Sequence, residues 1–307
     1  MKSRTCTLVL ACLTVLISTA ALAATPRDSI VVTADWLAKH VNDPDLVLLH
    51  VGDKASYEAG HIAGARLVSP LDVSVSDESP KGLILEMPPA EVLHKELEGL
   101  GISDKSRIIL YYVRALQPAS RILITLQYAG LGSHASILDG GLPAWERNNG
   151  ALTKEATPAR TGTLAPLKIQ PLILDAATVR SRIGAPGYAI VDGRASVYYD
   201  GVETAGSDTE RHRTGHIHGA LSIPFTSIID DKLMIKSDAE LLAMFTKAGV
   251  KPGDTVIGYC HIGLQTTAML LAARLLGHPV LLYDGSFQDW SRHPDYPVDN
   301  PSEKAAK

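Results

Sequence analysis

The chain has 307 residues, 46% of them hydrophobic, so it can bury one large core or two moderate ones, and two domains are the better expectation. Its formal charge is −4, which excludes the basic footprint of a nucleic-acid-binding protein. We therefore expect no nucleic-acid partner.

Residues 1–23 are predicted to be a secretory signal peptide. Lys2 and Arg4 form a basic segment, an uncharged run follows, and residues 21–23 read Ala-Leu-Ala, an A-x-A cleavage site. An uncleaved membrane anchor is less favoured because Thr, Ser and Ala dilute the run. A lipoprotein anchor at Cys12 is weaker still, since the apolar run before it is very short. We expect an exported, periplasmic protein without membrane contact after cleavage.

Cleavage would leave Cys260 as the only cysteine, because Cys6 and Cys12 belong to the leader. No internal disulfide could then form, although the compartment permits one. The mature chain would carry 27 basic and 33 acidic residues, a formal charge of −6. A lone thiol in an oxidising compartment is either a buried, inert side chain or a reactive thiolate.

One sequence unit occurs twice. Residues 47–65 and 189–220 share a strand pattern followed by Gly-His-Ile-x-Gly-Ala, and residues 138–145 and 283–290 share an aspartate, a glycine and a tryptophan. The spacing between matching positions varies, so the two units differ by insertions and deletions. The repeat predicts an N-terminal and a C-terminal domain.

The predicted boundaries follow from composition. We place the N-terminal domain at residues 24–150 and the C-terminal domain at residues 169–307. Residues 151–168, rich in Ala, Thr, Pro and Gly, lack a long apolar period and are predicted to form the linker.

Short β-branched runs alternate with longer helical patterns in both units. The predicted elements are strands over residues 46–51, 107–112, 189–192, 255–259 and 280–283, and helices including residues 90–100 and 239–248. Polar residues 237–240 and Gly249 mark the two ends of the last helix. Short buried strands that alternate with helices indicate an α/β fold, with a parallel sheet covered on both faces.

Cys260 directly follows the predicted strand of residues 255–259. Residues 261–265 would form a loop that leads to a helix starting near Thr266, and Gly263 suits a position with positive φ or close ligand approach. Ligands of parallel α/β units sit at such strand ends. Inward backbone N–H groups and the helix N-terminus would favour an anion at the sulfur, so Cys260 is expected to be a thiolate near neutral pH.

The combined motifs resemble the tandem-domain rhodanese sulfurtransferases of the thiosulfate/3-mercaptopyruvate type. They are the repeated Gly-His-Ile-x-Gly-Ala, Asp-Gly-Arg at residues 192–194, Cys-x-x-Gly at residues 260–263 and the closing Tyr-Asp-Gly-Ser-Phe of residues 283–287. The resemblance implies a doubly wound fold in each half. It also implies a catalytic C-terminal domain whose Cys260 takes sulfane sulfur from a donor and passes it to cyanide or a thiol. No metal or organic cofactor is needed.

The loop residues are the expected substrate- or persulfide-binding groups: His261, Ile262, Gly263, Leu264, Gln265 and Thr266. His261 stands where thiosulfate-using relatives often carry arginine, and a neutral imidazole attracts a dianion less than a guanidinium does. Residue 262 can be lysine in those relatives. The loop therefore fits neither the thiosulfate pattern nor the Gly-Ser-Gly pattern of mercaptopyruvate enzymes, and the donor stays open.

Asp192 and Arg194 resemble the family's Asp-x-Arg element. They are interpreted as an ion pair supporting the cleft, with contact to a substrate anion as the alternative. His61 and His216 recur in both halves, including the half without a thiol, so a turn-stabilising role is expected.

The N-terminal half lacks a thiol at the corresponding place, which is occupied by residues 111–117. We expect its helix to begin after Pro118 and its loop to contain three extra residues. The half is interpreted as a noncatalytic companion that covers the site of the other half.

Two alternatives to a sulfurtransferase have the same cysteine. A phosphatase of the rhodanese-like fold would need Cys-x5-Arg, but residue 266 is threonine. A noncatalytic persulfide carrier or thiol sensor, with a protein thiol as acceptor, is compatible with the sequence.

Overall fold

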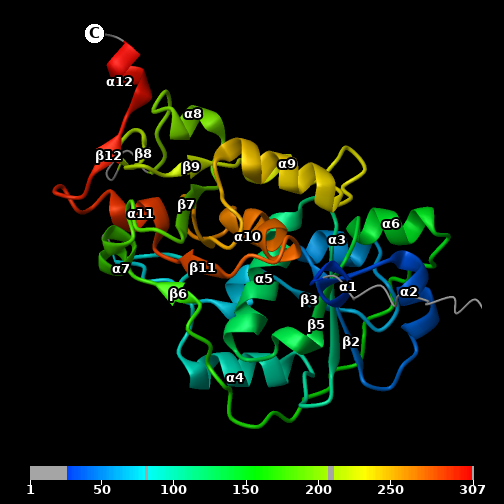
Figure 1. The fold of residues 1–307 in the computed structure, drawn as a ribbon. Coiled ribbons are helices and arrows are strands. Elements are labelled where there is room, and N and C mark those ends of the chain that lie inside the picture. The colour runs from blue at the N-terminus through cyan, green and yellow to red at the C-terminus, as the bar shows by residue number, and fades with distance from the viewer. Residues whose placement is uncertain (1–25, 80–81, 207–210, 306–307) are drawn as a thin grey trace, which may run out of the picture.

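The computed structural model describes residues 26–79, 82–206 and 211–305 (Figure 1). The predicted signal peptide lies outside the described residues. Among the helices that are described, none has both the length and the apolar character needed to cross a membrane.

The N-terminal domain is built on a parallel five-stranded sheet with strand order β1-β5-β4-β2-β3. Its strands are β1 (Val31–Val32), β2 (Leu46–Val51), β3 (Arg66–Val68), β4 (Arg107–Tyr112) and β5 (Ala135–Leu138). Its helices are α1 (Pro26–Ile30), α2 (Ala34–His40), α3 (Lys54–Ala59), η1 (Pro70–Val73), α4 (Ala90–Gly99), α5 (Leu116–Tyr128), η2 (Gly132–His134) and α6 (Gly141–Arg147).

The C-terminal domain repeats this topology with strand order β6-β11-β10-β7-β9. Its strands are β6 (Ile173–Leu174), β7 (Tyr188–Asp192), β9 (Leu221–Ser222), β10 (Thr255–Tyr259) and β11 (Val280–Tyr283), with a separate antiparallel pair of β8 (His216–Ile217) and β12 (Val298–Asp299). Its helices are α7 (Ala176–Ser181), α8 (Ser196–Tyr199), η3 (Phe225–Ser227), α9 (Asp238–Ala248), α10 (Thr266–Leu275), α11 (Ser286–Trp290) and α12 (Pro301–Ala305).

These two sheets confirm the predicted pair of doubly wound α/β domains. Each central strand is buried on both faces, which is why the strands read as apolar runs. The predicted ends of the helix at residues 239–248 also match α9: Ser237 and Glu240 form a capping box, and Gly249 ends the helix at φ +103°.

The repeated histidines hold equivalent turns. His61 stacks on Tyr57 and bonds the carbonyl of Tyr57, while His216 stacks on Tyr199 and bonds the carbonyl of Tyr199. Both imidazoles are buried against the turn that follows the first long strand of their domain. The geometry is that of a structural residue.

The loop of the N-terminal half differs from our expectation. α5 begins at Leu116, before Pro118, and only three residues separate it from β4, whereas six separate β10 from α10. Proline is tolerated in a first helical turn because its missing N–H has no intrahelical partner there. The prediction of a late helix start and a longer loop was therefore wrong: this loop is the shorter of the two.

The two domains pack through α5 and α10, which lie side by side at the centre of the molecule (Figure 1). Ser120 of α5 and Thr267 of α10 bond through their hydroxyls at 2.8 Å. One apolar cluster contains buried residues of both domains, including Ile122 and Leu270. The domain interface is thus part of the hydrophobic core.

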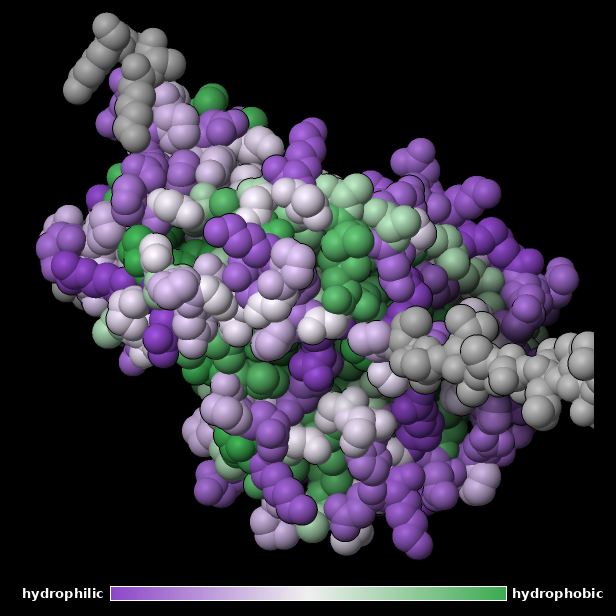
Figure 2. Space-filling view, in the orientation of Figure 1, coloured by the Kyte–Doolittle hydropathy of each residue, from purple (hydrophilic) through white to green (hydrophobic). Residues whose placement is uncertain are grey.

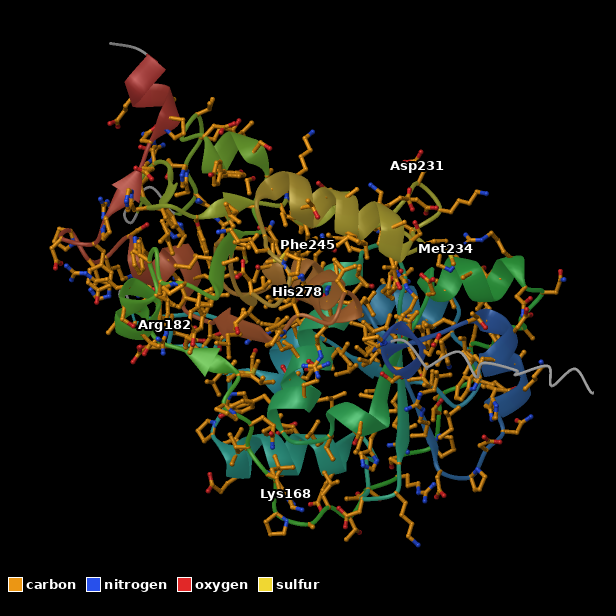
Figure 3. The ribbon with its side chains drawn as sticks, in the orientation of Figure 1. Lys168, Arg182, Asp231, Met234, Phe245 and His278 are labelled. Atoms are coloured by element: carbon orange, nitrogen blue, oxygen red, sulfur yellow. The ribbon has the colours of Figure 1, made fainter. Side chains whose placement is uncertain are left out.

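Each domain also extends an arm onto the other. The N-arm, residues 82–87, contacts the ends of β11 and α11 through hydrogen bonds of Met87 and Gly82. The C-arm, residues 229–235, reaches the N-terminal domain, and Figure 3 shows its Met234 beside α6. The N-arm is the one that approaches the loop of Cys260.

Candidate active site

Cys260 is fully buried at the carboxyl end of β10. Its N–H donates to the hydroxyl of Ser286 at 3.2 Å, and its carbonyl accepts from the N–H of Phe287 at 3.0 Å. The start of α11 therefore fixes the backbone on both sides of the sulfur. The predicted position of the cysteine, at a strand end before a helix, is the position that the structure shows.

The loop after Cys260 presents a row of free donors. None of the N–H groups of residues 261–266 donates a hydrogen bond within the described part of the chain, and no side chain caps the N-terminus of α10. Gly263 turns the loop at φ +73°, and a Cβ there would lie 2.8 Å from the carbonyl oxygen of Asp284. A loop of this form, continued by a helix N-terminus, stabilises negative charge.

Three loop side chains carry buried polar atoms without a hydrogen-bond partner among the described residues. They are His261 Nδ1, Gln265 Oε1 and Thr266 Oγ1. Buried polar groups are nearly always paired in folded proteins, so such a cluster indicates a place for a ligand or ordered water. The predicted substrate loop therefore has the unsatisfied polarity of a binding site, whereas Ile262 and Leu264 add no polar side chain.

His261 is neutral at pH 7. Burial lowers its pKa from 6.5 to about 4, and the neighbouring Arg194 and His212 act in the same direction while Asp192 opposes them. Tyr198 packs edge-on against the imidazole at 4.6 Å. His261 thus offers hydrogen bonds to a ligand and adds no positive charge to the loop.

Arg194 and Asp192 form a buried ion pair beside Cys260. The guanidinium donates to Asp192 Oδ2 at 2.6 Å and to the carbonyl of Gly215 at 2.7 Å, and it lies 4.1 Å from the ring centre of Phe287. Burial acts to lower the pKa of Arg194, but Asp192 and, to a smaller extent, Cys260 raise it, and the net direction is upward. The predicted ion pair is therefore present, with the cation close enough to influence the sulfur, and its support of the cleft stays a prediction.

The N-terminal domain supplies a second buried arginine that the sequence did not single out. Arg121 of α5 donates to the carbonyls of Gly263 and Leu85 and to the carboxylate of Asp284. Asp284 also accepts from the N–H of Met87 at 2.6 Å. Arg121 therefore ties the cysteine loop to the N-arm.

Glu86 of the N-arm is a second group that sequence reasoning missed. Its Oε1 is buried without a partner within the described residues. Burial raises its pKa from 4.5 to about 8, Asp284 and Asp289 add to the rise, and Arg121 opposes it. The carboxyl is therefore mostly protonated at neutral pH and can donate a hydrogen bond.

A sequence signal existed for only one of these two residues. Arg121 is the only charged residue of α5, a helix that is otherwise almost entirely apolar or small and buried. A lone charge in such a helix is a sign of a buried partner. Glu86 lies in an irregular segment and offers no comparable pattern.

Tyr112 occupies the place of Cys260 in the N-terminal half. The hydroxyl of Tyr111 accepts from the N–H of Ile62, as the hydroxyl of Tyr259 accepts from the N–H of Ile217. The next residue is therefore Tyr112 in one half and Cys260 in the other. The hydroxyl of Tyr112 donates to the carbonyl of Leu233 at 2.6 Å, so this position makes a contact between the domains.

Comparison with known proteins agrees with the fold. Residues 33–148 and 175–293 each match the rhodanese-like domain. The chain is 30% identical to a thiosulfate sulfurtransferase of Pseudomonas aeruginosa, over 88% of this chain and 97% of the relative. It is 31% identical to a probable 3-mercaptopyruvate sulfurtransferase of the same organism, over 87% of this chain and 96% of the relative.

Solved structures show the same fold. The wild-type structure of EanB superposes with a TM-score of 0.80 at 21% identity, over 91% of this chain and 71% of EanB. Together with the two matched domains and the sulfurtransferase relatives, this establishes that the chain belongs to the rhodanese family of sulfurtransferases, with two rhodanese-like domains in tandem.

Proposed function

We propose that Cys260 carries sulfane sulfur from a small donor to a thiophilic acceptor as a persulfide. The observation that carries the proposal is a buried thiol followed directly by residues 261–266, whose N–H groups donate no hydrogen bond among the described residues. After sulfur transfer, these donors can stabilise the terminal negative charge of the persulfide.

Both half-reactions balance without a cofactor. With thiosulfate as donor, the Cys260 thiolate attacks the outer sulfur, the sulfur–sulfur bond of the donor breaks, and sulfite leaves with the electron pair. Cyanide or a thiol then attacks the terminal sulfur of the persulfide. The bond to that sulfur breaks, and the Cys260 thiolate is regenerated.

The charges of the site bear on the choice of donor. Arg194 and Arg121 are each paired with an aspartate, and the pKa of His261 is lowered to about 4, so its imidazole is neutral at pH 7. Such a site attracts a dianion less strongly than a loop with a free arginine would. Thiosulfate and 3-mercaptopyruvate, for which the relatives are named, should both be compared with a polysulfide.

The activity test is the formation of thiocyanate from each donor and cyanide. Failure with all three donors would contradict the proposed enzyme. Intact-mass analysis after donor treatment should show one added sulfur on the wild type and none on Cys260→Ser. Sulfur uptake without turnover would instead identify a persulfide carrier, and phosphatase activity lost in Cys260→Ser would favour the phosphatase alternative.

We also propose that the protein is exported to the periplasm. The basic pair Lys2 and Arg4, the uncharged run and the Ala-Leu-Ala of residues 21–23 support this. When residues 1–307 are expressed, cell fractionation should find a processed protein in the periplasm with Ala24 as its first residue. When residues 24–307 are expressed, the protein should stay in the cytoplasm. If the protein expressed from residues 1–307 is found in the cytoplasm and still contains residues 1–23, export is disproved.

A further inference from the structure

A cleft opens between the domains at the C-terminal end of α10, which is the end away from Cys260. It has a volume of about 740 Å³, and an adjoining hollow of about 500 Å³ shares its central residues, Gln127, Ser133, Leu172 and Arg274. His278, labelled in Figure 3, also lines it. The volume is within the range of small-molecule sites, roughly 300–1,000 Å³.

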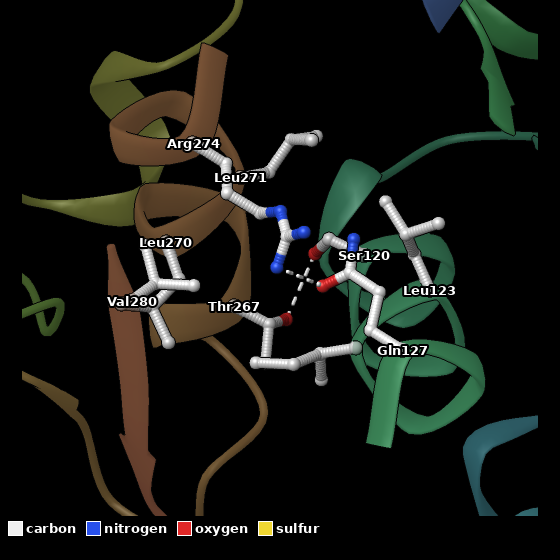
Figure 4. A pocket seen from close by; sticks show the side chains of 9 residues that line it. Ser120, Leu123, Gln127, Thr267, Leu270, Leu271, Arg274 and Val280 are labelled. Carbon is white, nitrogen blue, oxygen red and sulfur yellow. Dashed lines mark hydrogen bonds between the residues drawn. The ribbon is translucent and has the colours of Figure 1, made fainter. Parts of the chain in front are cut away.

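Arg274 is the charged group of this cleft. Its Nη1 donates to Gln127 Oε1 at 3.2 Å across the domain interface, as Figure 4 shows. Burial lowers the pKa of Arg274. The arginine has no salt-bridge partner among the described residues, although its guanidinium is partly withdrawn from water.

Two fully buried arginines have the counter-ion that Arg274 lacks among the described residues. Arg121 and Arg194 each face an aspartate, Asp284 and Asp192 respectively. A partly buried cation without a counter-ion costs free energy, and a ligand that supplies the negative charge recovers it. Arg274 therefore favours an anionic ligand.

The residues that line the cleft indicate which chemical groups the ligand would carry besides its negative charge. Within the part of the chain that the structure describes, no aspartate or glutamate lines either hollow. Ile30, Leu172, Pro279 and Leu281 provide apolar surface, and Ser133 provides a hydroxyl. On the face shown in Figure 2, apolar and hydrophilic residues meet where the two domains join. One cation beside a partly apolar wall is complementary to a single negative charge on an apolar body.

We propose that this cleft binds a small organic monocarboxylate, with the carboxylate on the guanidinium of Arg274 and the apolar body against Leu172 and Ile30. The planar guanidinium can hold both carboxylate oxygens, and the Gln127 bond keeps it in place. The ligand would touch both domains, since Ile30 and Gln127 belong to one and Arg274 and Leu172 to the other.

The test is a calorimetric titration of the mature chain carrying Cys260→Ser, which removes chemistry at the thiol. The probes are 4-phenylbutyrate and its uncharged amide, 4-phenylbutyramide. We expect one saturable site for the carboxylate and binding of the amide weaker by about tenfold or more, because only the carboxylate pairs with Arg274.

Three variants locate the site. Arg274→Gln should weaken carboxylate binding to the level of the amide, and Leu172→Trp, which fills the cleft and keeps the charge, should abolish binding of both probes. Arg180→Gln, a change at an exposed arginine of α7, should bind as the parent does. No saturation below about 10 mM, equal binding of the two probes, or unchanged binding in both Arg274→Gln and Leu172→Trp would overturn the proposal.

Discussion

Replacement of Arg121 by methionine would break the ion pair that joins the two domains at the cysteine loop. Arg121 is 1% exposed and Asp284 is 2% exposed, so removal of the cation leaves a buried carboxylate whose remaining hydrogen-bond donor among the described residues is the N–H of Met87. Breaking a buried pair on one side costs about 3–5 kcal/mol. The carbonyls of Gly263 and Leu85 lose a donor at the same time.

A double variant separates the cost of the unpaired carboxylate from the cost of the lost packing of Arg121. Arg121→Met with Asp284→Asn removes the uncompensated carboxylate, so it should recover about 2 kcal/mol or more of the loss. The free energy of unfolding is measured by urea denaturation at pH 7. Thiocyanate formation should fall in both variants, because the carbonyl of Gly263 loses its donor and the loop is less fixed.

An exposed pair gives the matched control. Lys54 and Glu58 form an ion pair on α3 with both side chains mostly exposed, so Lys54→Met should cost about 0.5 kcal/mol or less. A loss for Arg121→Met as small as that of the control would refute the reasoning, because it would mean that Asp284 is solvated without its partner.

Three further changes test the loop and its surroundings. Gly263→Ala should destabilise the protein by about 2 kcal/mol or more in urea denaturation and reduce turnover, because φ is +73° and the new Cβ would meet the backbone oxygen of Asp284; wild-type stability would contradict this. The folded protein keeps the proton of Glu86 up to a pKa of about 8, whereas the unfolded chain releases it near 4.5, so this residue lowers stability as pH rises through that window. Glu86→Gln should therefore melt close to the wild type near pH 4 and above it near pH 9, and identical melting profiles at both pH values would count against the assignment. His261→Arg adds a permanent cation, so kcat/KM for thiosulfate should rise about tenfold, the equivalent of roughly 1.4 kcal/mol; a gain that is equal for an uncharged donor would show that charge is not the cause.

The fold could be predicted from the sequence because its determinants are local. The strands at residues 46–51, 107–112, 255–259 and 280–283 have the same limits in the structure, since each is an apolar run that a parallel sheet buries on both faces. The position of Cys260 followed from the same pattern. A strand end next to a helix start is defined by nearby residues alone.

The contacts of the cysteine loop could not be predicted in this way. Arg121 and Asp284 are 163 residues apart and meet only because the domains dock through α5 and α10. The partner of a buried charge depends on this docking, which no periodicity encodes. The wrong expectation for α5 has a similar origin: Pro118 was treated as a helix boundary, although a proline in the first turn leaves the helix intact.

The arms show that the duplication extends to the domain interface. Leu85 of the N-arm has φ +62° and Leu233 of the C-arm has φ +63°, a strained conformation for a residue with a side chain. In each arm the carbonyl of that leucine accepts a hydrogen bond from a side chain of the N-terminal domain: Leu85 from Arg121 of its own domain, and Leu233 from Tyr112 of the other domain. The bond to Leu233 therefore exists only when both domains are present, whereas the bond to Leu85 lies within the N-terminal domain.

This reciprocity explains how a half without a thiol contributes to a thiol site. The carboxylates at the equivalent strand ends, Asp139 and Asp284, each accept from a backbone N–H of the opposite arm, that of Ile235 and that of Met87. On the side of Asp284, Arg121 also bonds both this carboxylate and the carbonyl of Gly263. The N-terminal domain thereby contacts the loop of residues 261–266 that follows Cys260, so the C-terminal domain alone would contain the proposed nucleophile without the contact that holds this loop.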